Sequence, residues 1–152
     1  MSPEDIETAL DLCERLCERF EGFRAKPYLD VAKVPTIGFG TTRYPGGERV
    51  QMSDPPVTRE QAREYMRDWL RRETLPAVLE YCPSIDTPGR MAAILDFTYN
   101  LGAARLETST LRKKIAAGQW EQVPAQLRKW VFAAGAIQPG LVKRRDAEAE
   151  MI

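Results

Sequence analysis

Three side chains near the N-terminus have the types and spacing for acid–base chemistry. Glu21 and Asp30 are carboxylates nine residues apart, and the hydroxyl of Thr36 follows six residues later. One carboxyl that holds a proton and a second that stays ionised can together cut a glycosidic bond. Our hypothesis is a hydrolytic site within residues 20–40, with the rest of the chain forming the walls of a cleft.

The position of Glu21 bears on whether it could act as the acid. It is expected on the last turn of a helix that Gly22 ends. A carboxylate there faces the negative end of the helix dipole, so its ionised form is disfavoured. Burial beside Phe20 or Phe23 would act in the same direction. By position alone an ordinary exposed glutamate is the more common case, and this alternative stays open.

The absence of histidine removes several rival chemistries. With no histidine in the chain, the usual Ser-His-Asp and Cys-His nucleophiles and His-ligated zinc hydrolases are excluded. The three cysteines, Cys13, Cys17 and Cys82, are too few and too sparse for a disulfide framework. Cys13 and Cys17 share one helical face, and we expect packing there because no second pair of ligands is visible. We therefore expect no metal and no cofactor.

The charges balance overall but not locally. The chain has 22 basic and 22 acidic side chains, which argues against a dedicated nucleic-acid binder. Residues 1–30 hold eight acids and four bases, whereas residues 110–145 hold eight bases and one acid. A basic wall could attract an anionic polymer, although solvated helix faces explain the pattern equally well.

Length and hydropathy predict one domain without a membrane span. At 152 residues the chain fits a single domain with its own core. There is no run of about 18 apolar residues, so no spanning helix is expected. The acidic N-terminus lacks the basic and apolar regions of a secretory signal. We expect the protein to stay in the cytosol unless something else releases it.

Capping signals and apolar periodicity place the first half of the chain. Ser2 and Pro3 begin an amphipathic helix over about residues 3–21. Glycine, proline, β-branched and aromatic residues over about 22–57 predict a small antiparallel β lobe. Thr58 and Gln61 form a capping box for a connecting helix over about 58–80, with a kink expected at Pro76.

The second half reads as a helical lobe over about residues 87–152. Its first helix, starting at Thr87-Pro88, is apolar most of the way round and is expected to be the buried centre. Further helices are predicted over about 110–117 and 120–130 and from Pro139 onward, with a turn at 133–136. Trp120 and Trp130 are expected to pack in the core rather than stack on a ligand.

Several motifs in this order resemble the phage-type lysozymes of glycoside hydrolase family 24. Glu21-Gly22-Phe23-Arg24, Asp30 and the stretch 36–42 (TIGFGTT) match the family's N-terminal signature without gaps. The stretch 96–102 (DFTYNLG) resembles its central-helix motif, and 139–148 (PGLVKRRDAE) its C-terminal pattern. Together the motifs cover about residues 10–150, so the resemblance extends over almost the whole chain.

The resemblance implies a lysozyme-like α+β fold, mostly helical, with a small β lobe, a larger helical lobe and a cleft between them. It implies hydrolysis of the β-1,4 bond between N-acetylmuramic acid and N-acetylglucosamine in peptidoglycan. Glu21 would be the general acid and Thr36 the holder of a water. Asp30 would be the ionised partner, which stabilises positive charge on the sugar, orients a water or acts as the nucleophile. Thr42, Tyr99 and Thr110 fall at motif positions that line the cleft, although a core role for Tyr99 is as good an explanation.

The family resemblance leaves some alternatives open. Thr41 stands where family members often carry histidine. A lytic transglycosylase would cut the same bond without water, and a non-catalytic wall-binding protein could use the same scaffold. The spacing does not give the distance between the carboxylates on which inversion or retention depends, although a water-holding Thr36 favours inversion.

The resemblance also implies how such an enzyme works in a cell. We expect a monomer that binds peptidoglycan strands but neither nucleic acid nor a cofactor. It would accumulate in the host cytoplasm and reach the cell wall in the periplasm through a membrane pore, a holin, made by another protein.

Overall fold

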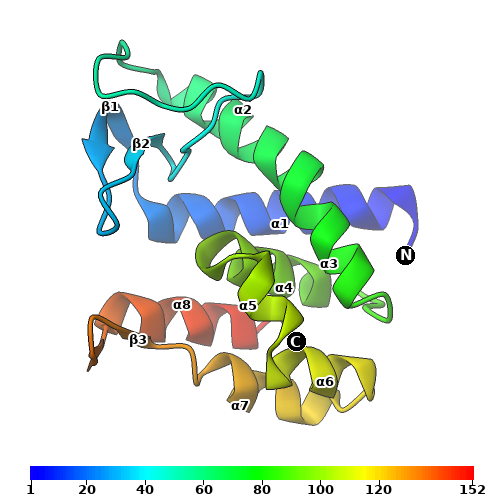
Figure 1. The fold of residues 1–152 in the computed structure, drawn as a ribbon. Coiled ribbons are helices and arrows are strands. Elements are labelled where there is room, and N and C mark those ends of the chain that lie inside the picture. Colours follow the sequence, from blue (N-terminus) through cyan, green and yellow to red (C-terminus); the bar gives the residue numbers. More distant parts are fainter.

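Helix α1 (Pro3–Glu21) connects the two lobes of the protein. In the computed structural model, which describes residues 1–152, it runs from the helical lobe to the start of the β lobe (Figure 1). Ser2 caps it as expected, because the Ser2 hydroxyl accepts from the Asp5 amide while the Asp5 carboxylate accepts from the Ser2 amide. Its buried face includes Leu10, Cys13 and Cys17, so the packing role expected for these two cysteines is confirmed.

The remaining elements follow in chain order. The β lobe holds β1 (Arg24–Leu29) and β2 (Pro35–Gly38). The helices that follow are α2 (Arg59–Trp69), a π-helical turn (Leu70–Thr74), α3 (Leu75–Tyr81), α4 (Pro88–Leu101), α5 (Ala103–Glu107) and α6 (Thr110–Ala116). The chain ends with a 3₁₀ turn (Trp120–Gln122), α7 (Val123–Leu127), β3 (Phe132–Ala133), β4 (Ala136–Ile137) and α8 (Pro139–Ala149).

The β lobe is a two-stranded antiparallel sheet followed by ordered loops. Tyr28 pairs with Thr36 and Leu29 with Pro35, so the β1–β2 turn is short. Beyond β2, isolated bridges join Ile37 to Thr41 and Arg43 to Arg49. The expected small antiparallel lobe beside a larger helical one is confirmed.

An ion-pair ladder joins α1 to α2. The Arg67 guanidinium reaches the carboxylates of Glu7, Asp11 and Glu14 at 2.7–3.0 Å, and Arg63 pairs with Glu18. The acidic excess of the first thirty residues is therefore matched by arginines of α2. Because most of these groups are exposed to solvent, each single pair contributes little to stability, but together the pairs hold the two helices in one register.

The disturbance expected at Pro76 takes the form of a π turn. The Leu75 amide donates to the Leu70 carbonyl five residues earlier, which widens the helix just before the proline. Proline has no amide hydrogen, and its ring would clash with the carbonyl four residues back. The wider turn removes this conflict, so the helical segment continues through α3 to Tyr81.

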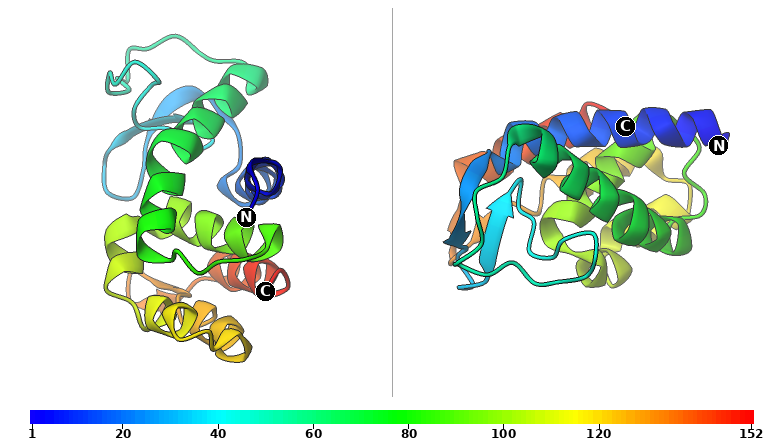
Figure 2. Two further views of the ribbon diagram at one scale, coloured as in Figure 1. Left: turned by 90° about the vertical axis from the view of Figure 1, so that its right-hand side faces the viewer. Right: turned by 90° about the horizontal axis from the view of Figure 1, so that it is seen from above.

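Helix α4 is the centre of the helical lobe. Every residue from Met91 to Thr98 is buried, and α4 lies between α1 on one side and α8 on the other (Figures 1 and 2). Trp130 packs edge-on against Phe97 with ring centroids 5.4 Å apart, and Trp120 also packs against the core cluster. The expected central helix and the core role of both tryptophans are confirmed.

The segment between α6 and α8 differs from the sequence prediction. A continuous helix over 120–130 was expected, but α7 ends at Leu127, where the Trp130 amide donates to the Leu127 carbonyl at 3.0 Å. The turn expected at 133–136 is the tip of a hairpin in which Phe132 pairs with Ile137 and Ala133 with Ala136. Two-residue strands are too short to show alternation in a sequence. None of the helices combines the length and apolar character needed to cross a membrane.

The contact between β2 and α2 yields a prediction. Gly38 has φ +66°, and a Cβ built there would lie 2.8 Å from the Ala62 Cβ of α2. Gly38→Ala should lower the free energy of unfolding by about 2 kcal/mol or more, since left-handed backbone costs about 1–2 kcal/mol and overpacking about 1–3 kcal/mol. Denaturant unfolding measures the change.

Gly47→Ala is the matched control, because Gly47 has φ +95° with no atom near the added Cβ. It should cost only the backbone term of about 1–2 kcal/mol. In the double variant Gly38→Ala/Ala62→Gly the steric part should be relieved. Equal losses for Gly38→Ala and Gly47→Ala would contradict the close packing of β2 on α2.

Candidate active site

One cavity brings together five of the six residues that the sequence singled out. It has a volume of about 420 Å³ and lies between the β lobe and the helical lobe. Its lining includes Glu21, Asp30, Thr36, Thr42 and Tyr99. These residues come from α1, the β1–β2 hairpin, the loop after β2 and α4, so the cavity is assembled from segments far apart in the chain.

Thr110 is the one predicted cleft residue that does not line this cavity. It is the exposed first residue of α6. The neighbouring Ser109 caps this helix by accepting from the Arg112 amide at 3.0 Å. The Ser109-Thr110 pattern therefore marks the start of a helix, and the structure does not bring Thr110 to the site.

Glu21 occupies the last position of α1, as the sequence predicted. The chain turns at Gly22, whose φ of +69° ends the helix. The Glu21 side chain is 22% exposed and lies close to the backbone of Gly40, where an added Cβ would be 3.2 Å from Glu21 Oε2. Gly40 therefore leaves room for the carboxylate against the loop after β2.

Arg144 fixes one oxygen of Glu21 from the interior. Its Nη1 donates to Glu21 Oε1 at 2.8 Å, while Nε and Nη2 donate to the two oxygens of Asp96 at 2.8 Å each. The guanidinium is only 4% exposed, so these charge-assisted bonds are strong and directional. Sequence reasoning had placed Arg144 in a basic wall, where nothing indicated that its charge is buried behind Glu21.

The Glu21 carboxyl lies at the C-terminal end of α1 and contacts the Arg144 guanidinium through one oxygen only. The contact leaves Oε2 without a protein partner, because only Oε1 accepts from Arg144. Oε2 is thus the oxygen from which a proton could pass to a bound substrate.

Asp30 is anchored through one oxygen and open at the other. Asp30 Oδ1 accepts from the amides of Ala32 at 2.8 Å and Val34 at 2.9 Å, which closes the turn of the β1–β2 hairpin. Oδ2 has no partner in the protein. The hairpin therefore holds the Asp30 side chain in one orientation, and Oδ2 is free of hydrogen bonds within the protein.

Thr36 is oriented by the same hairpin. Its hydroxyl donates to the Val34 carbonyl at 2.8 Å, and the residue is 3% exposed. Because the hydroxyl proton is committed to that carbonyl, the oxygen is left to accept a hydrogen bond. A water held there would have its own hydrogen directed at Thr36.

Tyr99 joins α4 to the loop that follows β2. The phenol donates to the Phe39 carbonyl at 2.6 Å, and burial raises the pKa of Tyr99 well above its ordinary value. The phenol therefore remains a donor and holds the loop that carries Gly40. The sequence left open whether Tyr99 packs in the core or lines the cleft. It does both, because it packs against the core and also lines the cavity.

Behind the cavity lies a buried cluster of charges. Burial and the neighbouring Asp96 carboxylate raise the pKa of Glu148 well above its ordinary value. Burial alone would raise the pKa of Asp96 as well, but the Arg144 guanidinium holds it below its usual range. The surroundings therefore disfavour the negative charge of Glu148 and favour that of Asp96.

Arg145 completes this cluster. It is fully buried and donates from Nη2 to Glu148 at 2.7 Å and to Asn100 at 2.9 Å. Its Nε and Nη1 have no hydrogen-bond partner. The guanidinium instead lies over the Phe97 ring, 5.4 Å from the centroid, which stabilises a desolvated cation.

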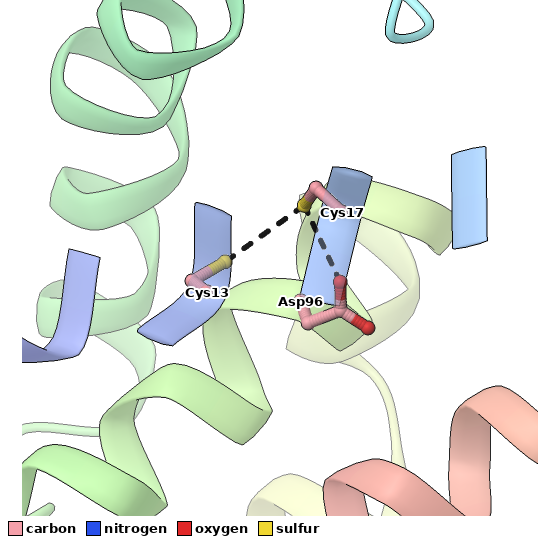
Figure 3. A group of neighbouring side chains, drawn as sticks. All are labelled: Cys13, Cys17 and Asp96. Atoms are coloured by element: carbon pink, nitrogen blue, oxygen red, sulfur yellow. Dashed lines mark hydrogen bonds between the residues drawn. The ribbon is translucent and has the colours of Figure 1, made fainter. Parts of the chain in front are cut away.

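Two cysteines of α1 pack against this buried cluster of charges. Cys13, Cys17 and Asp96 place their ligand atoms within 4.8 Å of one another (Figure 3). The Cys17 thiol donates to Asp96 at 3.3 Å, and burial raises the pKa of both thiols. Metal binding needs thiolates, and the Arg144 cation already holds the Asp96 carboxylate. The group therefore fits a hydrogen-bonded core cluster better than a metal centre.

Sequence reasoning missed seven other residues that line the cavity. They are Tyr28, Val31, Gly40, Thr41, Arg43, Trp69 and Asn100. The hairpin and loop residues adjoin Asp30 or the glycine motif, so proximity in the chain could have indicated them. Trp69 carried no such signal, because it lies in the apolar stripe of α2 and reaches the cavity only through the way that helix packs.

Comparison with known proteins gives a consistent picture. Residues 18–148 match the family model described as phage lysozyme. A SAR-endolysin of Bacteriophage PS119 is 33% identical over 134 residues, which cover 86% of this chain and 75% of that protein. An endolysin of Acyrthosiphon pisum secondary endosymbiont phage 1 is 33% identical over 138 residues, covering 88% and 89%.

A solved structure extends this similarity to three dimensions. The endolysin from Escherichia coli O157:H7 phage FAHEc1 superposes with a TM-score of 0.79 at 30% identity, covering 95% of this chain and 89% of that one. The similarity therefore extends over both lobes.

The raised pKa of Glu148 yields a prediction about the pH dependence of stability. A carboxyl whose pKa is raised by folding binds more protons in the folded than in the unfolded state, so stability falls as pH rises above about 4.3. Glu148→Gln removes this loss, and its amide oxygen can still accept from Arg145. The variant should unfold at the same or a higher temperature than wild type at pH 7, with the difference shrinking towards pH 4.

Thermal unfolding of both proteins in matched buffers from pH 4 to pH 8 measures this difference. Groups elsewhere in the chain titrate in both wild type and Glu148→Gln, so their effect on stability cancels in the difference between the two proteins. A wild type that gains stability over the variant as pH rises would show that Glu148 is ionised in the folded protein.

Proposed function

Because the chain belongs to the phage lysozyme family, we propose that it is an endolysin that hydrolyses the β-1,4 bond between N-acetylmuramic acid and N-acetylglucosamine in peptidoglycan. The observation that carries the proposal is the cavity that gathers Glu21, Asp30 and Thr36 between the two lobes. It contains two carboxyls with different surroundings and a hydroxyl that can accept a hydrogen bond, which is the minimal equipment for glycoside hydrolysis.

In the proposed reaction Glu21 protonates the leaving glycosidic oxygen. The proton is carried on Oε2, since Oε1 accepts from Arg144. As the bond to the leaving oxygen breaks, positive charge develops on the sugar ring, and the carboxylate of Asp30 stabilises it across the cavity. The negative charge left on Glu21 after proton transfer is stabilised by the guanidinium already in contact with it.

A water completes the reaction by attacking the anomeric carbon. The free Oδ2 of Asp30 accepts a hydrogen bond from this water and takes its proton as the water oxygen bonds to the anomeric carbon, while the Thr36 oxygen accepts the other hydrogen. Both acceptors are fixed by the β1–β2 hairpin, so the water is held in one orientation. An attack by water from the face opposite the leaving group inverts the anomeric configuration.

Arg144 and Asp96 act as positioning residues in this scheme. Asp96 receives two bonds from the guanidinium and thereby determines where Nη1 points, and Nη1 in turn holds Glu21. A general acid has to be held in productive geometry, and α1 alone cannot do this because Glu21 is its final residue.

Two other functions remain to be distinguished by experiment. A lytic transglycosylase needs one acid and forms an anhydro sugar without water, so the anchored Asp30 and Thr36 would have no role. A non-catalytic wall-binding protein would not need the three groups at all. Mass spectrometry of digested peptidoglycan separates these cases, since hydrolysis leaves reducing ends and transglycosylation leaves anhydro ends.

The route to the substrate is part of the proposal. The enzyme acts as a monomer, accumulates in the host cytoplasm and cuts the wall in the periplasm after release through a holin pore. The complete set of candidate groups within one chain supports action as a monomer.

The role of Glu21 is tested by Glu21→Gln. Loss of the general acid should reduce lysis of outer-membrane-permeabilised cells by at least about 100-fold, measured as turbidity beside wild type. The thermal unfolding midpoint should change little, because the glutamine oxygen can still accept from Arg144 and Asp96 keeps the guanidinium paired. Full lytic activity in this variant would contradict the role of Glu21 as the general acid.

The water-holding groups are tested by Asp30→Asn and Thr36→Ala. Each should lower kcat by about tenfold or more, the loss expected for about 1.4 kcal/mol of transition-state stabilisation. Asp30→Asn keeps an oxygen for the Ala32 and Val34 amides, so the hairpin should stay folded. Thr36→Ser, which retains the hydroxyl, is the matched control. Normal turnover in Thr36→Ala would contradict the water-holding role of Thr36.

The stereochemistry is a separate test. NMR of the first products formed by wild type should show the inverted anomer.

A further inference from the structure

The β3–β4 hairpin presents an apolar tip to solvent. All six residues from Phe132 to Ile137 are apolar or glycine, and all are exposed. Phe132 is 62% and Ile137 58% exposed, and the two are cross-strand partners. Figure 1 shows the hairpin beside the first turn of α8, at the end of the helical lobe. Its side chains therefore contribute little to the core.

The hairpin is well defined despite its exposure. The Gln138 amide donates to the Val131 carbonyl at 2.9 Å, and the Gln138 side chain donates to the Ala133 carbonyl at 2.9 Å. At the tip, Ala134 and Gly135 both have positive φ, 52° and 77°, which is the conformation of a type I′ turn. Asparagine or aspartate is favoured at the first of these positions. Ala134 is less favourable for the turn than either of them, but it keeps the tip apolar.

The chain on both sides of the hairpin carries an excess of positive charge. No acidic residue occurs between Glu121 and Asp146, and Asp146 is paired with Arg128 at 3.0 Å. Lys129, three residues before Phe132, and Lys143, six residues after Ile137, are exposed. Neither lysine takes part in any ion pair of the structure. The exposed apolar tip is thus flanked in the chain by two unpaired lysines.

We propose that this hairpin docks the protein on the surface of an anionic phospholipid bilayer. Phe132 and Ile137 insert at the level of the headgroups, and Lys129 and Lys143 contact the lipid phosphates. Aromatic and aliphatic side chains flanked by lysines are the chemistry that binds a membrane interface without crossing it. The proposal goes beyond glycan cleavage and does not depend on the roles given to the cavity residues.

Two other occupants fit the hairpin less well. A second copy of the chain would bring Lys129 and Lys143 against the same cations, and the two-residue strands offer little area to a stable dimer. A glycan strand is hydrated and neutral along its sugars, and the hairpin side chains offer it no hydrogen bonds. An anionic lipid surface matches both the apolar tip and the charge.

The experiment is co-sedimentation of the purified protein with vesicles. Vesicles of phosphatidylethanolamine and phosphatidylglycerol should bind wild type at low salt, and vesicles of phosphatidylcholine alone should bind at least fivefold less. Because the contribution of the lysines is screened by salt, binding should fall severalfold in 0.5 M NaCl. Size-exclusion chromatography without lipid should show a monomer.

Matched variants separate the hairpin from the rest of the surface. Phe132→Ser should reduce binding by at least fivefold, whereas Leu79→Ser, which changes an exposed leucine of α3, should not. Lys143→Glu should reduce binding similarly, whereas Lys113→Glu on α6 should not. Cleavage of soluble peptidoglycan fragments should be unchanged in Phe132→Ser, since Phe132 does not line the cavity, and thermal unfolding should show that each variant is folded.

Several results would overturn the proposal. These are no binding of wild type to the anionic vesicles, equal binding to both vesicle types, or equal binding of wild type and Phe132→Ser. Dimerisation that Phe132→Ser abolishes would assign the hairpin to a second copy instead. Vesicle binding by a protein that fails to cleave peptidoglycan would refute the proposed hydrolysis but leave the docking intact.

Discussion

The buried guanidinium of Arg144 is the contact on which both the core and the cavity depend. It links Asp96 of α4 and Glu21 of α1 to α8 through three bonds of 2.8 Å. A cation buried there without a carboxylate partner would cost several kcal/mol, so the packing of α8 against α4 depends on the pair of Arg144 and Asp96. The orientation of the candidate acid is therefore set from the interior of the helical lobe.

The two sides of the cavity are held by different kinds of constraint. On the β side, Asp30 and Thr36 are fixed by bonds to residues two to four positions away, so the short hairpin orients its own reactive groups. On the helical side, Glu21 is held by a residue 123 positions later in the chain. This division suits the proposed reaction, because the water-holding groups form one rigid unit and the acid belongs to another.

Local signals in the sequence predicted the elements well and their interruptions poorly. The capping boxes at Ser2 and Thr58 involve residues three apart, so the sequence pattern and the structure agree. The π turn before Pro76 and the early end of α7 depend on how neighbouring helices pack, and no local pattern indicates them. Thr110 was assigned to the cleft by motif position, whereas the structure places it at an exposed helix start.

By itself the sequence determined the chemistry that is available. The absence of histidine, the spacing of Glu21, Asp30 and Thr36 and the order of the motifs pointed to a family and to carboxylate catalysis, because these are properties of residue type and position. Only the tertiary structure decided that Arg144 faces Glu21, that burial raises the pKa of Glu148 and that Trp69 reaches the cavity. Burial and long-range contacts set these features, and both arise when distant segments pack together.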